Sequence, residues 1–139
     1  YSWALLSQSA YTDSSKTSPV NMGQLVSGNR YYVGISLKNT GNTIWHQDST
    51  NPFGIGPATT NQVDIVGKYC DSSWPGGLSS CKRAAYLHEF TVAPGQIGSF
   101  EFWITAPSTP GSYNDTYAPL MEGVAWLNNH TSSFPAIVH

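Results

Sequence analysis

Few side chains in this sequence of 139 residues are of the types that carry out chemistry. His46 and Asp48 are two positions apart, so in a strand they would share one face and could hold a metal ion. A metal site needs three or four ligands, and the four histidines of the chain show no recurring spacing. We therefore interpret this segment as a polar loop and expect neither a metal nor another cofactor.

Paired carboxylates are a second route to catalysis, because glycoside hydrolysis uses two of them at a defined separation. Of the eight acidic residues, Glu89, Glu101 and Glu122 lie on or next to expected strands. Glu101 falls on the strand face that we expect to be solvated, where an ordinary surface charge is the simpler interpretation. No spacing marks a catalytic pair, and no nucleophile elbow, P-loop, HExxH or CxxC pattern occurs.

The two cysteines are the remaining candidates, either as a nucleophile with His88 as its base or as a disulfide. Cys70 and Cys81 flank ten residues that include the turn-forming run Trp74-Pro75-Gly76-Gly77. This arrangement favours a disulfide over two free thiols, and a bridged cysteine cannot attack a substrate. The bridge would stabilise the fold by about 3 kcal/mol and points to an oxidising compartment. We therefore expect a protein that is not an enzyme and is extracellular or at the cell surface.

The composition excludes several classes of function. Charged residues make up 10% of the chain and its net charge is −2, with Lys82–Arg83 as the only adjacent basic pair. Nucleic acids need clustered cations, so we expect no binding to them. No apolar stretch approaches the roughly 20 residues that span a bilayer, so we expect no membrane insertion. The chain shows no signal peptide and no initiator methionine, which suggests a mature product or a module cut from a longer protein.

Side-chain patterns predict short strands joined by turns. No segment places apolar residues at helical spacing for three turns, and nine prolines and thirteen glycines interrupt the chain. The segments 30–38 and 99–105 alternate between apolar and polar side chains, which is typical of half-buried strands. Their predicted core residues are Tyr31, Val33, Ile35 and Leu37 in the first segment and Phe100, Phe102 and Ile104 in the second.

Shorter extended segments complete the predicted architecture. They are expected at 43–45, 53–55, 63–66, 83–92, 112–121, 124–127 and 134–138. We predict an all-β fold, an immunoglobulin-like antiparallel β-sandwich of about seven to nine strands, with a barrel as the alternative. The chain is predicted to be a single domain over 1–139, in which residues 1–19 are an N-terminal extension or an edge strand.

Several motifs occur in a fixed order along the chain. The first is Leu37-Lys38-Asn39-Thr40-Gly41-Asn42-Thr43-Ile44-Trp45, followed by Val92-Ala93-Pro94-Gly95-Gln96, by 102–107, by Pro110-Gly111-Ser112-Tyr113 and by Glu122-Gly123-Val124-Ala125-Trp126. The first resembles the signature strand and turn of the four-tryptophan domains, and the others resemble later strands of that family in the right order. These domains are immunoglobulin-like modules of selective-autophagy receptors and of bacterial exported proteins. The resemblance covers about residues 20–127 and implies that Trp45 and Trp126 are core aromatics.

The chain departs from the family pattern at two of its tryptophans. The strand before the Asn39–Asn42 turn contains no tryptophan, and Tyr117 stands where another one is expected. The partner surface of the autophagy receptors is therefore not transferred to this protein. The cysteines and the polar surface are closer to the bacterial exported members, which implies an accessory role beside a cell-wall or carbohydrate-active domain.

Aromatic side chains outside the expected core are the candidate binding residues. Trp103 should point away from the core residues of its strand, Trp74 lies in the tip of the bridged loop, and Tyr69 flanks that loop. Exposed rings next to Asn and Ser side chains suit sugar faces or protein hot spots. The alternative is that Trp103 is covered by residues 1–11 or by the bridged loop, and that Trp74 is buried.

Three functions compete on these observations. The favoured one is a non-catalytic recognition or scaffolding module of a larger secreted or cell-surface protein, monomeric within a multidomain chain, with a glycan or protein partner. The second is a carbohydrate-binding module that uses surface Trp and Tyr side chains. The third is a small hydrolase, which the lack of a catalytic pattern disfavours.

Overall fold

The chain folds into β-strands, and the computed structural model describes residues 2–48 and 50–139 without any α-helix among them. Tyr1 and Ser49 lie outside the described residues. The described part contains ten strands, which are Trp3–Tyr11 (β1), Arg30–Asn39 (β2), Trp45–His46 (β3), Phe53–Pro57 (β4), Ala85–Tyr86 (β5), Thr91–Val92 (β6), Ile97–Thr105 (β7), Gly111–Met121 (β8), Ala125–Trp126 (β9) and Ser132–Val138 (β10). Two short 3₁₀ helices are Met22–Gln24 (η1) and Gly77–Ser79 (η2). None of the described segments is a helix with the length and hydrophobicity needed to cross a bilayer.

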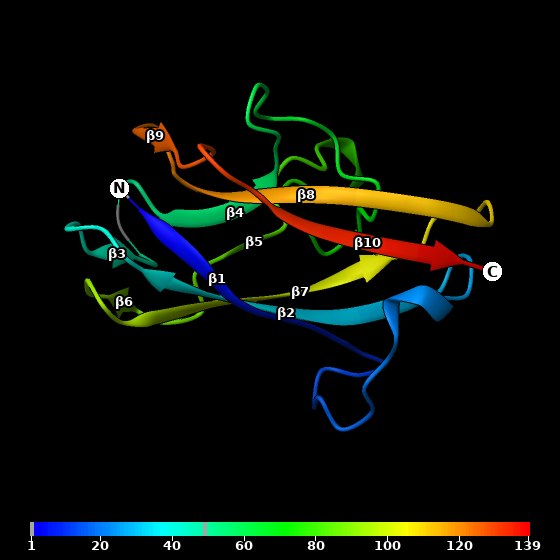
Figure 1. Ribbon diagram of the computed structural model, residues 1–139. Coiled ribbons are helices and arrows are strands. Elements are labelled where there is room, and N and C mark those ends of the chain that lie inside the picture. Colours follow the sequence, from blue (N-terminus) through cyan, green and yellow to red (C-terminus); the bar gives the residue numbers. More distant parts are fainter. Residues whose placement is uncertain (1, 49) are drawn as a thin grey trace.

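The strands form two layers that face each other (Figure 1). One layer is a three-stranded sheet with the order β1-β2-β7. The other is a five-stranded sheet with the order β10-β8-β4-β5, in which β9 also pairs with β8, while β3 and β6 pair separately. These antiparallel layers confirm the predicted all-β sandwich, and the immunoglobulin-like topology stays a prediction. The strand count exceeds the predicted seven to nine because four strands are only two residues long.

Alternation along β2 and β7 sorts their side chains to the two faces of the three-stranded sheet. In the antiparallel register of the two strands, Val33 lies opposite Phe102 and Gly34 lies opposite Glu101. The predicted core residues are all buried, namely Tyr31, Val33, Ile35, Leu37, Phe100, Phe102 and Ile104. Because successive side chains of a strand point to opposite faces, the intervening residues lie on the outer face, and these are Tyr32, Gly34, Ser36, Ser99, Glu101 and Trp103.

Trp45 is fully buried, as predicted, and belongs to an aromatic cluster that joins the two layers. Its ring stacks on Phe53 of β4 with the centroids 4.3 Å apart, and Phe53 in turn lies 6.2 Å from the Phe100 ring of β7. Gly98 makes room for this cluster, since a Cβ there would lie 2.8 Å from Leu87 and 3.3 Å from the Trp45 ring. Aromatic contacts of this kind contribute about 0.5–1.5 kcal/mol beyond the burial of their area.

The N-terminal segment is an edge strand of the three-stranded sheet, where β1 pairs with β2 along its length. The indole N–H of Trp3 donates to the carbonyl of Leu127 at 2.8 Å, and its ring stacks on His130. The amide of Gln8 donates to the carbonyl of Ser133 in β10 at 2.9 Å. These contacts connect the edge of one layer to the other layer.

Three predictions from the sequence are wrong. Residues 63–66 form no strand and belong to the loop between β4 and β5, and the segment 83–92 is broken into β5 and β6. Trp126, predicted as a core aromatic, is only partly buried, and the guanidinium of Arg83 lies over its ring at 5.0 Å. The reason is that β9 pairs with the end of β8, and the Trp126 ring lies against β4, where a Cβ at Gly56 would be 3.3 Å from it.

The predicted disulfide is present between Cys70 and Cys81, whose Cα atoms are 5.4 Å apart. It closes part of the loop between β4 and β5, and it leaves no free cysteine in the described part of the chain. This loop carries Tyr69 and Trp74, so the bridge bears directly on the candidate binding residues.

Removal of the bridge should destabilise the fold by about 3 kcal/mol, because the unfolded chain regains the entropy that the closed loop takes from it. Urea unfolding of the C70A/C81A variant, followed by tryptophan fluorescence, measures the loss. Wild-type protein unfolded in the presence of a dithiol reductant is the matched comparison and should unfold at a similarly lowered midpoint. A double variant as stable as the oxidised wild type would contradict this prediction.

Candidate functional site

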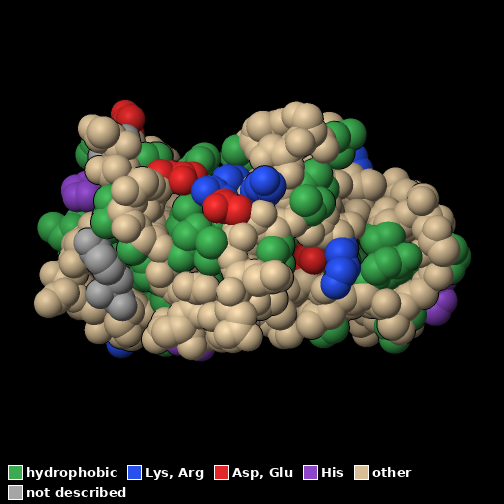
Figure 2. Space-filling view, turned by 90° about the horizontal axis from the view of Figure 1, so that it is seen from above, with side chains coloured by type: hydrophobic (Ala, Val, Ile, Leu, Met, Phe, Trp, Pro, Cys, Tyr) green, Lys and Arg blue, Asp and Glu red, His purple; other side chains and the backbone are tan. Residues whose placement is uncertain are grey.

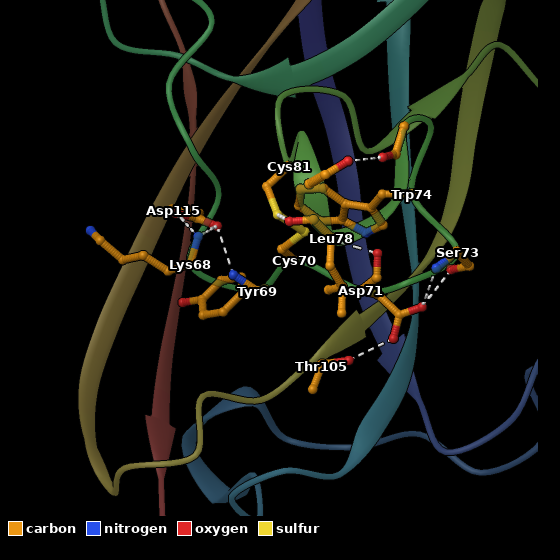
Figure 3. Close-up of a disulfide and its surroundings, with 12 residues drawn as sticks. Lys68, Tyr69, Cys70, Asp71, Ser73, Trp74, Leu78, Cys81, Thr105 and Asp115 are labelled. Carbon is orange, nitrogen blue, oxygen red and sulfur yellow. Dashed lines mark hydrogen bonds between the residues drawn. A yellow bond between two sulfur atoms is a disulfide. The ribbon is translucent and has the colours of Figure 1, made fainter.

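Two of the three predicted binding aromatics are buried, which corrects the prediction for them. Trp74 is 2% exposed, and its indole N–H donates to the carbonyl of Trp103 at 2.6 Å. Tyr69 is fully buried, and its hydroxyl donates to the carbonyl of Phe134 at 2.7 Å. The bridged loop folds back onto the sandwich instead of projecting from it (Figure 3), with the Trp74 ring packed edge-on against Phe102.

Asp71 fixes this loop against β2 and β7. Its buried carboxylate accepts two hydrogen bonds of 2.8 Å from the Arg30 guanidinium and one of 2.6 Å from the Thr105 hydroxyl. It also accepts from the hydroxyl and the backbone N–H of Ser73 (Figure 3). The hydrogen bond from Arg30 and those from Ser73 and Thr105 outweigh burial and hold the pKa of Asp71 well below its usual value. The loop is therefore tied to the sheet through a permanently charged group at neutral pH.

Asp115 of β8 holds the loop on the other side of Cys70. Its carboxylate accepts from the backbone N–H groups of Lys68 at 2.8 Å and of Tyr69 at 3.2 Å, and from the hydroxyl of Tyr117 at 3.2 Å. Burial raises the pKa of Asp115 above its usual value, although these donors favour the charged form. Figure 3 shows the two carboxylates on either side of the disulfide.

The outer face of the three-stranded sheet carries a groove of about 320 Å³. Gly34 leaves its floor open, since a Cβ at this position would find no atom within 4 Å. In the part of the chain that the structure describes, the hydroxyls of Ser7, Ser9 and Ser36 make no hydrogen bond inside the protein. They can therefore donate to a ligand and accept from it. The groove is lined by Ser7, Ser9, Tyr11, Lys16, Gly34, Ile35, Ser36, Glu89, Ile97, Ser99 and Glu101.

A turn after β1 brings the Lys16 side chain to this groove. Asp13 organises the turn by accepting from the Ser15 hydroxyl and from the backbone and hydroxyl of Thr17. Lys16 has a φ of 59°, a left-handed conformation that is uncommon for residues other than glycine. Its ammonium group lies 2.9 Å from the carboxylate of Glu101. The turn, which lies on the outer side of the sheet (Figure 1), thus places a cation beside the groove.

Glu101 is held as a carboxylate by two donors. Besides the Lys16 ammonium, the hydroxyl of Tyr32 donates to it at 3.0 Å. Burial raises the pKa of Glu101, but the hydrogen bonds from Lys16 and Tyr32 outweigh it, so the pKa lies below its usual value. Burial and the hydrogen bond to Glu101 raise the pKa of Tyr32 to about 12, which keeps its hydroxyl protonated. A general acid needs a raised pKa instead, so Glu101 suits the acceptance of ligand hydroxyls better than proton transfer.

Trp103 is the predicted binding aromatic that does reach the surface. It is half-buried, with the Arg30 guanidinium 4.5 Å from its ring centroid and the Tyr32 ring packed edge-on at 5.2 Å. Trp103 and Tyr32 line a second groove of about 400 Å³, together with Ser73, Pro75, Ala84, Ala85, Tyr86, Glu101 and Phe102. Glu101 lines both grooves, so they adjoin at this residue.

Two of the candidate catalytic carboxylates, Glu89 and Glu101, line the same groove. Glu89 accepts from the backbone N–H and the hydroxyl of Ser99 at 2.7 and 2.6 Å. Both carboxylates are thus engaged as hydrogen-bond acceptors within the fold. A carboxylate in such a groove can also accept hydrogen bonds from ligand hydroxyl groups.

The remaining candidates for chemistry do not line these two grooves, although Tyr86 of the second groove donates from its hydroxyl to Glu122 at 2.7 Å. Glu122 pairs with Arg83 at 2.7 Å, and Figure 2 shows acidic and basic side chains together in the middle of the face on the side of the five-stranded sheet. His46 and Asp48 are both exposed. Among residues 2–48 and 50–139, no group of three or more His, Cys, Asp or Glu side chains could hold a metal ion.

Lys16, Gly34 and the serines of β1 were not predicted from the sequence as binding residues. Gly34 is on the outer face of a predicted strand, but glycine carries no side chain to mark a site. Lys16 reaches Glu101 across 85 residues of sequence, and only the Asp13–Thr17 turn, with its polar side chains, signals an organised loop. The two residues meet because β1 pairs with β2 and β2 with β7, and this order of strands leaves no local pattern.

The chain matches no family model and no curated protein. Its structure is similar to that of a family 123 glycoside hydrolase from Clostridium perfringens, described for glycolipid glycan hydrolysis, with a TM-score of 0.35 and 13% sequence identity. The similarity covers 99% of this chain and 27% of the hydrolase chain. A similarity at this level carries no argument about fold or function.

The lowered pKa of Asp71 predicts a pH-dependent stabilisation. The folded state binds the proton of this carboxyl less tightly than the unfolded chain, so the stabilisation is complete above the unfolded pKa of roughly 3.9 and is lost as the pH falls below it. Asp71→Asn should lower the free energy of unfolding by about 2 kcal/mol at neutral pH. The difference from wild type should shrink in acid, as measured by urea unfolding at a series of pH values.

Asp48→Asn, at an exposed position, is the matched control for this series and should stay within about 0.5 kcal/mol of wild type throughout. If the difference between Asp71→Asn and wild type were constant from neutral pH to acid, the ion pair with Arg30 would not be its source.

Proposed function

We propose that this chain is a non-catalytic recognition module of an exported protein, and that it binds a carbohydrate on the outer face of the β1–β2–β7 sheet. The observation that carries this proposal is the groove over Gly34, where unbonded serine hydroxyls, the Lys16 ammonium and two carboxylates converge beside aromatic rings. Sugars offer many hydroxyl donors and acceptors together with an apolar ring face. Serine hydroxyls and carboxylates can form hydrogen bonds with the sugar hydroxyls, and Tyr or Trp rings can pack against the apolar face of the sugar ring.

The composition of the groove favours a carbohydrate over a protein partner. Protein interfaces centre on large aromatic or apolar anchors that fill pockets. Here two of the three predicted aromatic anchors, Trp74 and Tyr69, are buried in the fold, and the third, Trp103, has the Arg30 guanidinium over its ring. The groove is instead lined mainly by small hydroxyl side chains and by charged groups that are already paired.

The cysteine bridge supports the exported location in this proposal. Disulfides persist in oxidising compartments, and the Cys70–Cys81 bridge holds the loop that borders the second groove. We place the module outside the cell or at its surface, as an accessory to a carbohydrate-active or cell-wall domain. The similarity of its motifs to the four-tryptophan domains is compatible with that role and stays a prediction.

Filling the groove floor should abolish binding while leaving the fold intact. Gly34→Val adds a side chain whose Cβ would find no atom within 4 Å, and a β-branched residue suits a strand better than glycine. We expect wild-type protein to bind at least one of cellulose, chitin and peptidoglycan in pull-down assays. Gly34→Val should bind it at least tenfold more weakly, with an unchanged or higher midpoint of urea unfolding.

Ser112→Val is the control, because it introduces the same side chain at an exposed position of β8 in the other sheet, and it should bind as wild type does. Equal binding by Gly34→Val and wild type would reject the groove as the site. Release of soluble sugar by the wild-type protein would reject the non-catalytic function.

A further inference from the structure

The two grooves on the outer face form one path that meets at Glu101. The first groove crosses β1 and β2 over Gly34, and the second continues from β7 to Tyr86 and Pro75. A single carboxylate at their junction can accept hydroxyl groups from ligand units on both sides. The path is therefore suited to a ligand with repeated hydroxyl-bearing units.

The segment after β5 extends this path beyond the edge of the three-stranded sheet. The backbone N–H of His88 donates to the carbonyl of Ser99 at 2.9 Å, so this segment runs beside β7. Tyr86 lies two residues before His88, and Glu101 lies two residues after Ser99, in agreement with the groove that Tyr86 and Glu101 share. With neighbouring strands about 4.8 Å apart, the path from β1 to Tyr86 is about 14 Å long. This is longer than one six-membered sugar ring.

The disulfide-bridged loop forms the far wall of the path. Ser73 and Pro75 belong to this loop and line the second groove. Asp71 holds the loop in place through its bonds to Arg30 and Thr105, and the bridge restrains it further. A wall that is fixed before the ligand arrives costs little ordering entropy on binding.

The charges along the path favour a neutral ligand. The first groove contains one ammonium group, from Lys16, and two carboxylates, from Glu89 and Glu101, which leaves it with a net charge of −1. The same charge pattern repels the carboxylates of a uronic acid chain, since like charges in a groove of low dielectric cost free energy.

We infer that this path binds a linear, neutral pyranose chain across the strands, with several consecutive units in contact, and that affinity therefore rises with chain length. The inference rests on the proposed function and adds the class of carbohydrate and the direction in which it lies. Tyr86 is the contact for the distal units, because it is half-buried and lines the second groove but not the first.

Chain-length titrations test this inference. Wild-type protein is titrated by calorimetry with β-1,4-linked glucose and N-acetylglucosamine oligosaccharides of two to six units, and with oligogalacturonates of the same lengths. We expect roughly tenfold tighter binding of the longer neutral oligomers than of the disaccharide, and weaker binding of the charged series. Tyr86→Ala should weaken the binding of the longer oligomers more than that of the disaccharide, so that the gain with length is lost.

Tyr86→Phe is the matched control, because it keeps the ring and, like Tyr86→Ala, loses the hydrogen bond from the hydroxyl to Glu122. It should keep the gain with length. Equal affinity of wild type for all lengths, equal weakening of all lengths by Tyr86→Ala, or tighter binding of the galacturonates would overturn the inference and leave the proposed function standing. Binding of no oligosaccharide or insoluble glycan would overturn the proposed function itself.

Discussion

The alternation of side chains along β2 and β7 is the constraint on which both the core and the candidate site depend. The inward row packs against the aromatic cluster around Trp45 and Phe53, while the outward row builds the grooves. A shift of one residue in either strand would exchange the two rows, which would expose the apolar side chains and bury the polar ones. The hydrophobic core thereby enforces the register that sets Gly34 opposite Glu101. The pairing of β2 with β7 therefore determines both which side chains form the core and which side chains line the groove.

The bridged loop is attached to the sandwich through two carboxylates whose pKa values are shifted in opposite directions. Asp71 is stabilised in its charged form by Arg30, whereas burial makes the charged form of Asp115 less favourable. Acid therefore weakens the first attachment, while protonation of Asp115 is easier in the folded state than in the unfolded chain. Arg30 also lies over the ring of Trp103, so the group that neutralises Asp71 covers one face of the surface tryptophan. Loop attachment and groove shape are thus coupled through a single guanidinium.

Features that depend on neighbours in sequence were predictable, and features that depend on distant contacts were not. The alternating strands and the disulfide follow from local spacing and from a turn-rich loop between the cysteines. Burial of Trp74 and Tyr69 depends on carbonyl groups of β7 and β10, which no local pattern places beside the loop. Trp126 was expected in the core, but its ring lies against Gly56 of β4 and beneath the Arg83 guanidinium, and neither neighbour is marked by the local sequence. The Lys16–Glu101 pair arises from strand order, which a single sequence does not reveal.

At Gly34, the residue that would best stabilise the strand differs from the residue that keeps the groove open. Glycine is a poor residue for the middle of a strand, because it has the most backbone freedom to lose and no side chain to pack. Nothing in the surrounding structure excludes a larger residue there. Random mutation would therefore tend to replace this glycine with a better sheet former, unless selection for an open groove opposes the change. In proteins that descend from this chain, a glycine at position 34 would indicate that the groove still binds its ligand. A larger residue there would indicate that binding was lost while the fold became more stable.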